Sequence, residues 1–335
     1  MRVHAPPLLG RLALFIAAAF GFSWALWFLS PLLSHDPSAA LAIDELATFG
    51  PAIAALLVAQ DRRASVRPSR ALAVGAALVT VLLTALLLAP QWADAGSPLA
   101  ICVLAVLTVA PAALVWGCAS RSPRLRGLLG SILAPRSPWW TYAVALLLIP
   151  AASLLGSGLV ALIGGDLGAP PHVIGESSWT AVPFVFALTL LFGGPLGEEI
   201  GWRGWLLPNL QSRLSPLLAS LFVGVVWGCW HLPLHLRGVY EADMGNGIAG
   251  VALRIASSCL LAVLFTWLYN RSRGGLLAVI LLHTSVNNTS GYWLPVNAGL
   301  TIVLLLVAVI VVLTDRMYAR PGVTSESPAA SAQDH

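Results

Sequence analysis

The chain has 335 residues, of which 58% are hydrophobic and only 10% are charged. Because soluble domains carry about 25% charged residues, this composition excludes an ordinary soluble protein and indicates a polytopic membrane protein. The formal net charge of +4 does not indicate a nucleic-acid partner, since the basic residues follow the ends of hydrophobic segments instead of clustering on one surface.

The hydrophobic pattern predicts an all-α fold, a bundle of about ten transmembrane helices, since one span requires about 20 mainly apolar residues. The first apolar segment is too long for a signal peptide and is not followed by a clean small-x-small cleavage site, so we expect an uncleaved anchor. The predicted spans cover residues 11–33, 39–60, 71–90, 98–119, 138–164, 179–206, 216–236, 248–270, 274–291 and 294–314.

The basic residues predict how these spans are oriented. All 18 are arginines, and with both termini in the cytoplasm only Arg237 and Arg254 fall on the outer side. This is the bias that the positive-inside rule describes. The composition, rich in arginine and alanine, suggests a bacterial source. We therefore expect an integral protein of the bacterial inner membrane with both termini cytoplasmic.

Polar residues are distributed unevenly among the spans. The first five spans contain little polar chemistry apart from Asp44 and Glu45, which we expect to reach the membrane interface from a helix end. The sixth to ninth spans contain almost all the other polar groups, and the last residues are small and polar enough to be disordered. The predicted division is 1–175 for the N-terminal spans, 176–292 for the functional core, 293–314 for the final span and 315–335 for a disordered cytoplasmic tail.

Two adjacent glutamates, Glu198 and Glu199, lie in the sixth span, within a stretch that otherwise has the composition of a membrane helix. A carboxylate at the bilayer centre costs a few kcal/mol, so an intramembrane pair is by default a functional hypothesis. Arg203 follows Glu199 by one helical turn. This spacing favours a salt bridge that would keep the carboxylate ionised inside the membrane.

Two more polar pairs with the same spacing follow in the seventh and ninth spans. Trp227 shares a helix face with His231, and His283 shares one with Asn287. A single helical histidine is more often a hydrogen-bonded core residue than a catalytic group. Three polar pairs on neighbouring spans would nevertheless be costly if each faced lipid, so we expect them to converge on one site.

These pairs occur in an order that resembles a known family, the CAAX protease and bacteriocin-processing (CPBP) family, once called Abi proteins, which includes the type II CAAX prenyl endopeptidases. The resemblance covers about residues 179–290. Trp227 stands where many members have phenylalanine, a change that retains an aromatic wall. The three motifs are Glu198-Glu199-x-x-x-Arg203, Trp227-x-x-x-His231 and His283-x-x-x-Asn287.

The resemblance implies an intramembrane endopeptidase that hydrolyses a peptide bond of a membrane-associated protein or peptide. Glu198 and His231 would hold and deprotonate the attacking water. His283 and Asn287 would donate hydrogen bonds to the tetrahedral oxygen. A prenylated C-terminus, a bacteriocin leader and a membrane-bound regulator are all compatible substrates. The supporting residues would be Glu199, Arg203 and Trp227.

Other functions remain compatible with the same residues. Glu198, His231 and His283 are plausible zinc ligands of a metalloprotease-like enzyme, although the sequence contains no His-Glu-x-x-His motif and no Cys-x-x-Cys pair. Pro233 is expected to end or kink its helix, which would leave His235 at the membrane interface and not in the ligand set. A proton-coupled transporter and a non-catalytic immunity or binding protein are further alternatives. We expect no cofactor.

The polar pairs can converge only if their side chains lie at a similar depth in the membrane. Hydropathy puts Glu198 near the cytoplasmic end of the sixth span, whereas His231 lies about 15 residues, or roughly 22 Å of helix, into the seventh. The sixth span must therefore continue helically past Trp205, or the seventh must begin after Pro216. We expect a cytoplasm-facing polar cavity that also includes His283.

Overall fold

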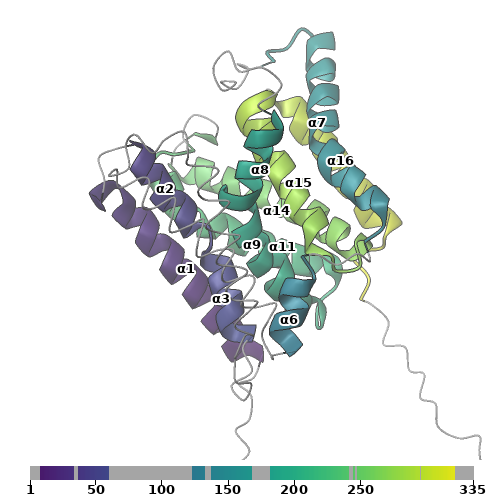
Figure 1. Cartoon of the computed structure of the whole chain (residues 1–335). Helices are drawn as coiled ribbons and strands as arrows, with labels where there is room; N and C mark the ends of the chain where they lie inside the picture. Colours follow the sequence, from purple (N-terminus) through teal and green to yellow (C-terminus); the bar gives the residue numbers. More distant parts are fainter. Residues whose placement is uncertain are drawn as a thin grey trace, which may run out of the picture.

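The computed structural model has helices as its only regular elements within the part of the chain that it describes, which confirms the predicted all-α membrane bundle (Figure 1). The predicted spans at 71–90 and 98–119, the tail beyond residue 320 and most of the loop at 165–178 lie outside the described residues. The described residues are 8–33, 37–59, 123–132, 137–167, 182–240, 244–245, 247–294 and 296–320.

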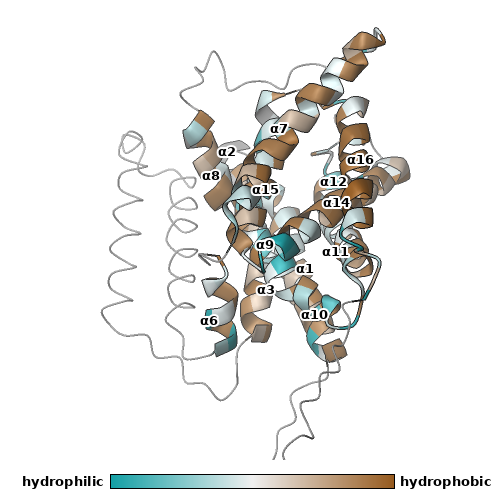
Figure 2. Ribbon diagram, turned by 90° about the vertical axis from the view of Figure 1, so that its right-hand side faces the viewer, coloured by the Kyte–Doolittle hydropathy of each residue, from teal (hydrophilic) through white to brown (hydrophobic). Residues whose placement is uncertain are grey.

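Three described helices are long and apolar enough to cross a membrane: α1 (Leu8–Leu33), α7 (Trp139–Leu162) and α14 (Gly247–Arg271). Two shorter apolar helices are α11 (Pro216–Trp230) and α16 (Ala298–Thr314). These helices are predominantly hydrophobic, whereas α9, at the middle of the bundle, is strongly hydrophilic (Figure 2). This distribution is that of an integral membrane protein with a polar interior.

The sixth predicted span is interrupted just before the paired glutamates. After α8 (Val182–Phe192) the chain turns at Gly194, whose φ of +97° is one that residues with a side chain rarely adopt. A new helix, α9 (Pro195–Gly201), then begins with a proline, which is well suited to the first helical position. Helical structure continues through a π-helix, η3 (Trp202–Leu206), and α10 (Leu207–Gln211).

This continuous helical run allows Glu198 and His231 to lie at a similar depth in the membrane, as convergence requires. Glu198 precedes Gln211, the end of the run, by about 13 residues, which is roughly 20 Å of helix. His231 follows Pro216, the start of α11, by about 15 residues, or roughly 22 Å. Only residues 212–215 connect the two segments, so both side chains lie at a similar depth. The predicted continuation of the sixth span is confirmed, and α11 begins where the sequence predicted.

The N-terminal helices pack directly on the helices that contain the polar pairs. The second predicted span consists of α2 (Pro37–Ala47) and α3 (Gly50–Ala59), and both contact α1. α3 also packs on α9, where a Cβ at Gly201 would lie only 2.3 Å from the Pro51 Cβ. Close approach through small residues is a common way to pack membrane helices. In Figure 1 these N-terminal helices cover one side of the bundle.

The opposite side of the bundle is formed by α7 and α16 (Figure 1). They cross at Gly156 and Gly299, where a Cβ on Gly156 would lie 2.4 Å from the Gly299 carbonyl carbon. α15 (Leu276–Asn288) packs between α7 and α9 and continues into a second π-helix, η4 (Thr289–Trp293). The remaining described helices are α6 (Pro123–Gly130) and α12 (Leu232–Leu236).

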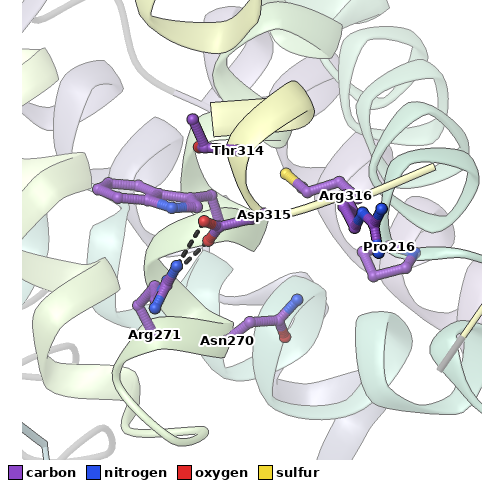
Figure 3. Close-up of a pocket in the computed structure, with 8 residues that line it drawn as sticks. Pro216, Asn270, Arg271, Thr314, Asp315 and Arg316 are labelled. Atoms are coloured by element: carbon purple, nitrogen blue, oxygen red, sulfur yellow. Dashed lines mark hydrogen bonds and ion pairs between the residues drawn. The ribbon is translucent and has the colours of Figure 1, made fainter. Parts of the chain in front are cut away.

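An ion pair joins the ends of α14 and α16 beside a cavity of about 430 Å³ (Figure 3). Arg271 donates from Nε to Asp315 Oδ2 at 2.6 Å and from Nη2 to Oδ1. These hydrogen bonds hold the pKa of Asp315 below its ordinary value. Because the Arg271 side chain is 51% exposed, the pair orders the two helix ends more than it stabilises the fold.

Candidate active site

One cavity of about 480 Å³ brings the predicted polar pairs together. The predicted residues that line it come from α9, from the C-terminal end of α11 and from α15, as convergence required. Glu199 and Arg203 do not line the cavity but are fully buried behind it. The predicted residues among its lining are Glu198, Trp227, His231, His283 and Asn287.

Glu198 is held by the residues that surround its two carboxylate oxygens. The Trp227 indole Nε1 donates to Oε2 at 2.6 Å. On the other side, a Cβ at Gly194 would lie 2.7 Å from Oε1, so only glycine leaves that oxygen enough space. The side chain is 4% exposed. One oxygen is therefore fixed by the indole, and no described residue hydrogen-bonds to the other.

Trp227 does more than form the aromatic wall that the sequence predicted. Besides its bond to Glu198, its ring meets the His283 ring edge-on with centroids 5.3 Å apart. The guanidinium carbon of Arg203 lies 4.8 Å above the same ring, a cation–π geometry. Treating tryptophan as equivalent to phenylalanine missed the indole donor, although a buried indole normally seeks a hydrogen-bond partner.

His231 lies at the junction between α11 and α12, where α11 ends ahead of Pro233 as expected. Its Nδ1 is 2.8 Å from the carbonyl oxygen of Trp227. Since a carbonyl oxygen only accepts, Nδ1 must carry the hydrogen, and in the neutral ring the lone pair belongs to Nε2. The Nε2 atom of His231 is therefore the basic nitrogen, and it takes no part in the hydrogen bond to the backbone.

Behind the cavity, Glu199 joins His283 to Arg203. The Oε1 atom of Glu199 accepts from Arg203 Nη1 at 2.8 Å, so the predicted i,i+4 salt bridge is confirmed. The same oxygen is 2.8 Å from His283 Nδ1. Because it faces a guanidinium, this oxygen is an acceptor and His283 Nδ1 carries a hydrogen. With its Nδ1 hydrogen directed to Glu199, His283 can donate from Nε2 only as an imidazolium.

Asn287 connects α15 to the break before α9. Its Nδ2 donates to the Gly193 carbonyl at 3.2 Å, which uses one of the two amide hydrogens. The second amide hydrogen is available to a group bound in the cavity. Asn288, the next residue, is instead fully buried and donates to the Thr284 carbonyl at 3.0 Å.

Two acidic residues that we expected at the membrane interface belong to this cavity, so that prediction is wrong. α2 places Asp44 and Glu45 in the cavity lining, and Asp44 accepts from Arg237 at 2.7 Å and 3.0 Å. The sequence did contain a sign that Asp44 has a partner inside the protein. Arg237 is one of the two arginines that did not follow the positive-inside pattern. A largely buried arginine needs a counter-charge, and Asp44 provides it.

The interfacial location predicted for His235 is also wrong. Its side chain is 8% exposed and packs against Gly250 of α14, where a Cβ would lie 2.6 Å from its Cε1. Pro233 ends α11 but tolerates a new helical turn, since the amide of His235 still donates to the His231 carbonyl at 3.2 Å. The sequence also missed Tyr240 and Arg254, which line the cavity from outside the three motifs.

The zinc alternative requires several ligands around one point. Within the described ranges, no group of three or more His, Cys, Asp or Glu side chains is arranged to hold a metal ion. Glu198 is engaged by an indole, and His283 directs Nδ1 to Glu199. These bonds leave the other Glu198 oxygen and the Nε2 atoms of both histidines unused, but no set of described donors surrounds a common point as a zinc site requires.

Comparisons with known proteins agree with the motifs. Residues 179–289 match the family described as type II CAAX prenyl endopeptidase Rce1-like. CAAX prenyl protease 2 of Methanococcus maripaludis is 33% identical over 149 residues, which are 44% of this chain and 54% of that protein. The chain thus spans about half the length of this relative. The motifs, the helical fold and both matches agree that residues 179–289 of this chain are similar to the type II CAAX prenyl endopeptidases.

Proposed function

We propose that this protein is a membrane-embedded endopeptidase that hydrolyses a peptide bond of a membrane-associated protein or peptide. The observation that carries the proposal is the fixed placement of Glu198 and His231 on one buried cavity. Both are hydrogen-bonded to the same residue, Trp227. The segment that matches the endopeptidase family includes all three residues.

In the proposed reaction, Glu198 and His231 Nε2 hold a water molecule between them. As the water oxygen attacks the substrate carbonyl carbon, Glu198 takes its proton and the carbonyl oxygen becomes an oxyanion. The C–N bond then breaks, and the proton passes to the departing amine. The free amide hydrogen of Asn287 supports its role as a donor to the oxyanion.

His283 would act as the second oxyanion donor in its imidazolium form. Glu199 would accept the Nδ1 hydrogen of that form through the same oxygen that accepts from Arg203. Arg203 lies between two aromatic rings, since its guanidinium carbon is 4.8 Å from the Trp227 ring and 4.6 Å from the Phe265 ring. These contacts fix the residues that orient His283.

The helices around the cavity are apolar, which supports the proposal that the substrate approaches the cavity from the lipid bilayer. We propose a location in the bacterial inner membrane with both termini in the cytoplasm, on the basis of the arginine distribution. Protease accessibility of tags at the two ends of the full chain, in sealed spheroplasts, tests this orientation: both tags should resist an externally added protease.

Comparison of membranes that contain the wild type or Glu198→Gln tests the activity. New peptide termini are identified by mass spectrometry in each membrane. We expect at least one cleavage product that is present with the wild type and absent with Glu198→Gln, which retains the shape of the side chain without its basic carboxylate. Identical sets of termini in the two membranes would contradict the proposed function.

We further propose that hydrolysis does not use a metal, which the arrangement of the described donors supports. The purified wild type should contain no stoichiometric zinc and should retain turnover after prolonged treatment with a chelator. One zinc per chain, with turnover lost on removal and restored on re-addition, would instead support the metalloprotease alternative.

A further inference from the structure

Arg254 lies on the cavity wall, in the interior of an apolar helix. It follows the start of α14 by about seven residues, roughly 10 Å along the axis. A guanidinium within a membrane helix is costly and normally pairs with an opposite charge or serves a function. Arg254 is also one of two arginines that did not follow the positive-inside pattern.

The other buried or part-buried arginines of the site region have carboxylate partners. Arg203 pairs with Glu199, and Arg237 pairs with Asp44. Arg254 makes no ion pair within the described part of the chain. Its buried Nε has no hydrogen-bond partner. The Nε hydrogen of this guanidinium is therefore unused among the described residues.

Tyr240 holds this arginine in place. The Arg254 guanidinium carbon lies 4.4 Å from the centre of the Tyr240 ring, and Nη2 donates to the hydroxyl oxygen at 3.4 Å. The Tyr240 ring in turn lies 6.0 Å from the His231 ring, centre to centre. Arg254 and Tyr240 therefore form a positively charged wall beside the residue proposed to activate water.

We propose that Arg254 and Tyr240 form a subsite for a carboxylate of the peptide substrate, an inference that rests on the proposed endopeptidase function. A guanidinium presents a planar fork that matches a carboxylate in two parallel hydrogen bonds. The Tyr240 hydroxyl provides an additional donor. A bound carboxylate would supply the ion-pair contact that Arg254 lacks among the described residues. The carboxylate belongs either to the C-terminus of the substrate or to an aspartate or glutamate side chain.

The test measures peptide binding to the full chain in phosphatidylcholine nanodiscs. The probe is an N-palmitoylated, fluorescein-labelled decapeptide of alanine, leucine and serine. It is prepared with a free C-terminal carboxylate, with a C-terminal amide, and as the amide with one internal glutamate. Binding is measured by fluorescence anisotropy in the Glu198→Gln background, so that it does not depend on turnover.

We expect at least one acidic peptide to bind more tightly than the neutral amide. Arg254→Gln should lower the affinity for that peptide by about 10- to 100-fold, the loss expected for a charge-assisted hydrogen bond. The neutral amide should bind equally to both proteins. Arg254→Lys, which retains charge without the fork, and Tyr240→Phe should each produce smaller losses. The acidic peptide that loses affinity identifies the source of the carboxylate.

Arg271→Gln is the matched control, because it removes an arginine from the separate cavity of Figure 3 and should leave all three affinities unchanged. The subsite is refuted if the Glu198→Gln protein with Arg254 intact does not prefer an acidic peptide, or if Arg254→Gln weakens binding of the acidic and neutral peptides equally. A dependence on Arg254 that is found only with phosphatidylglycerol in the nanodiscs would assign it to a lipid headgroup and overturn the inference. Proteolysis by Glu198→Gln would refute the proposed function but not this subsite.

Discussion

The side chain and the backbone of Trp227 each hold one site residue in place, Glu198 and His231 respectively. Its indole N–H donates to Glu198, while its carbonyl accepts from His231. The backbone contact is retained by any residue at this position, but the indole contact is specific to tryptophan. Trp227 is therefore a positioning residue for the carboxylate, and its two contributions can be separated by mutation.

Trp227→Phe should lower kcat by about 10- to 100-fold, because it removes a hydrogen bond to a buried charged group and retains the ring. KM should change less than kcat, since the substituted phenylalanine retains an aromatic ring in the cavity lining. Trp202→Phe is the matched control, because the indole nitrogen of Trp202 is buried without a hydrogen-bond partner. Steady-state kinetics on both variants measures the difference, and an equal loss in both would refute positioning by the indole.

The sequence predicted the motif residues well for a physical reason. Each pair lies one helical turn apart, so a single helix brings its members to one face, and the cost of burying polar groups brings the faces together. Glu45, Tyr240 and Arg254 were missed because their places in the cavity depend on packing between helices that are distant in sequence. No local pattern encodes such packing.

Among the elements, the break before α9 determines where Glu198 lies. Hydropathy averages over a window, so the Gly-Gly-Pro sequence at residues 193–195 was included in one apolar span. The structure separates α8 from α9 at this point, which moves Glu198 from the end of a helix to the beginning of one. The long spans without such breaks, α1, α7 and α14, lie close to their predicted positions.

Gly194→Ala should impair both the fold and the site. The positive φ costs about 1–2 kcal/mol with a side chain present, and the new methyl group would contact Glu198 Oε1. We expect lower thermal stability together with reduced kcat. Gly158→Ala, in the last third of α7, is the control, because a Cβ there meets no atom within 4 Å. Thermal unfolding and turnover of both variants provide the comparison, and a fully active, stable Gly194→Ala would contradict this role for the break.

At the scale of the whole molecule, the site extends beyond the segment that matches the family. α1 and α2 are tied to the core by the Asp44–Arg237 pair and by the Trp24 indole, which donates to the Trp230 carbonyl at 2.9 Å. Asp44 and Glu45 complete the cavity wall from the N-terminal part of the chain. The N-terminal helices α1 and α2 are thus structural components of the cavity.

A double-mutant cycle on Asp44→Asn and Arg237→Gln tests this connection. Each single variant leaves one charge without its partner, so we expect each to lower the free energy of unfolding by about 1–3 kcal/mol. The double variant should be less destabilised than the sum of the two, with a coupling of about 1 kcal/mol for a pair about one-fifth exposed. Additive losses would show that the pair does not hold the N-terminal helices to the core.

The most direct measurement of the central claim is turnover by purified wild type and Glu198→Gln on the precursor of a cleavage product identified in membranes. If Glu198 is the base that activates water, kcat should fall by about 10²–10⁴-fold while the affinity for the precursor is retained. Robust proteolysis by Glu198→Gln would contradict the account.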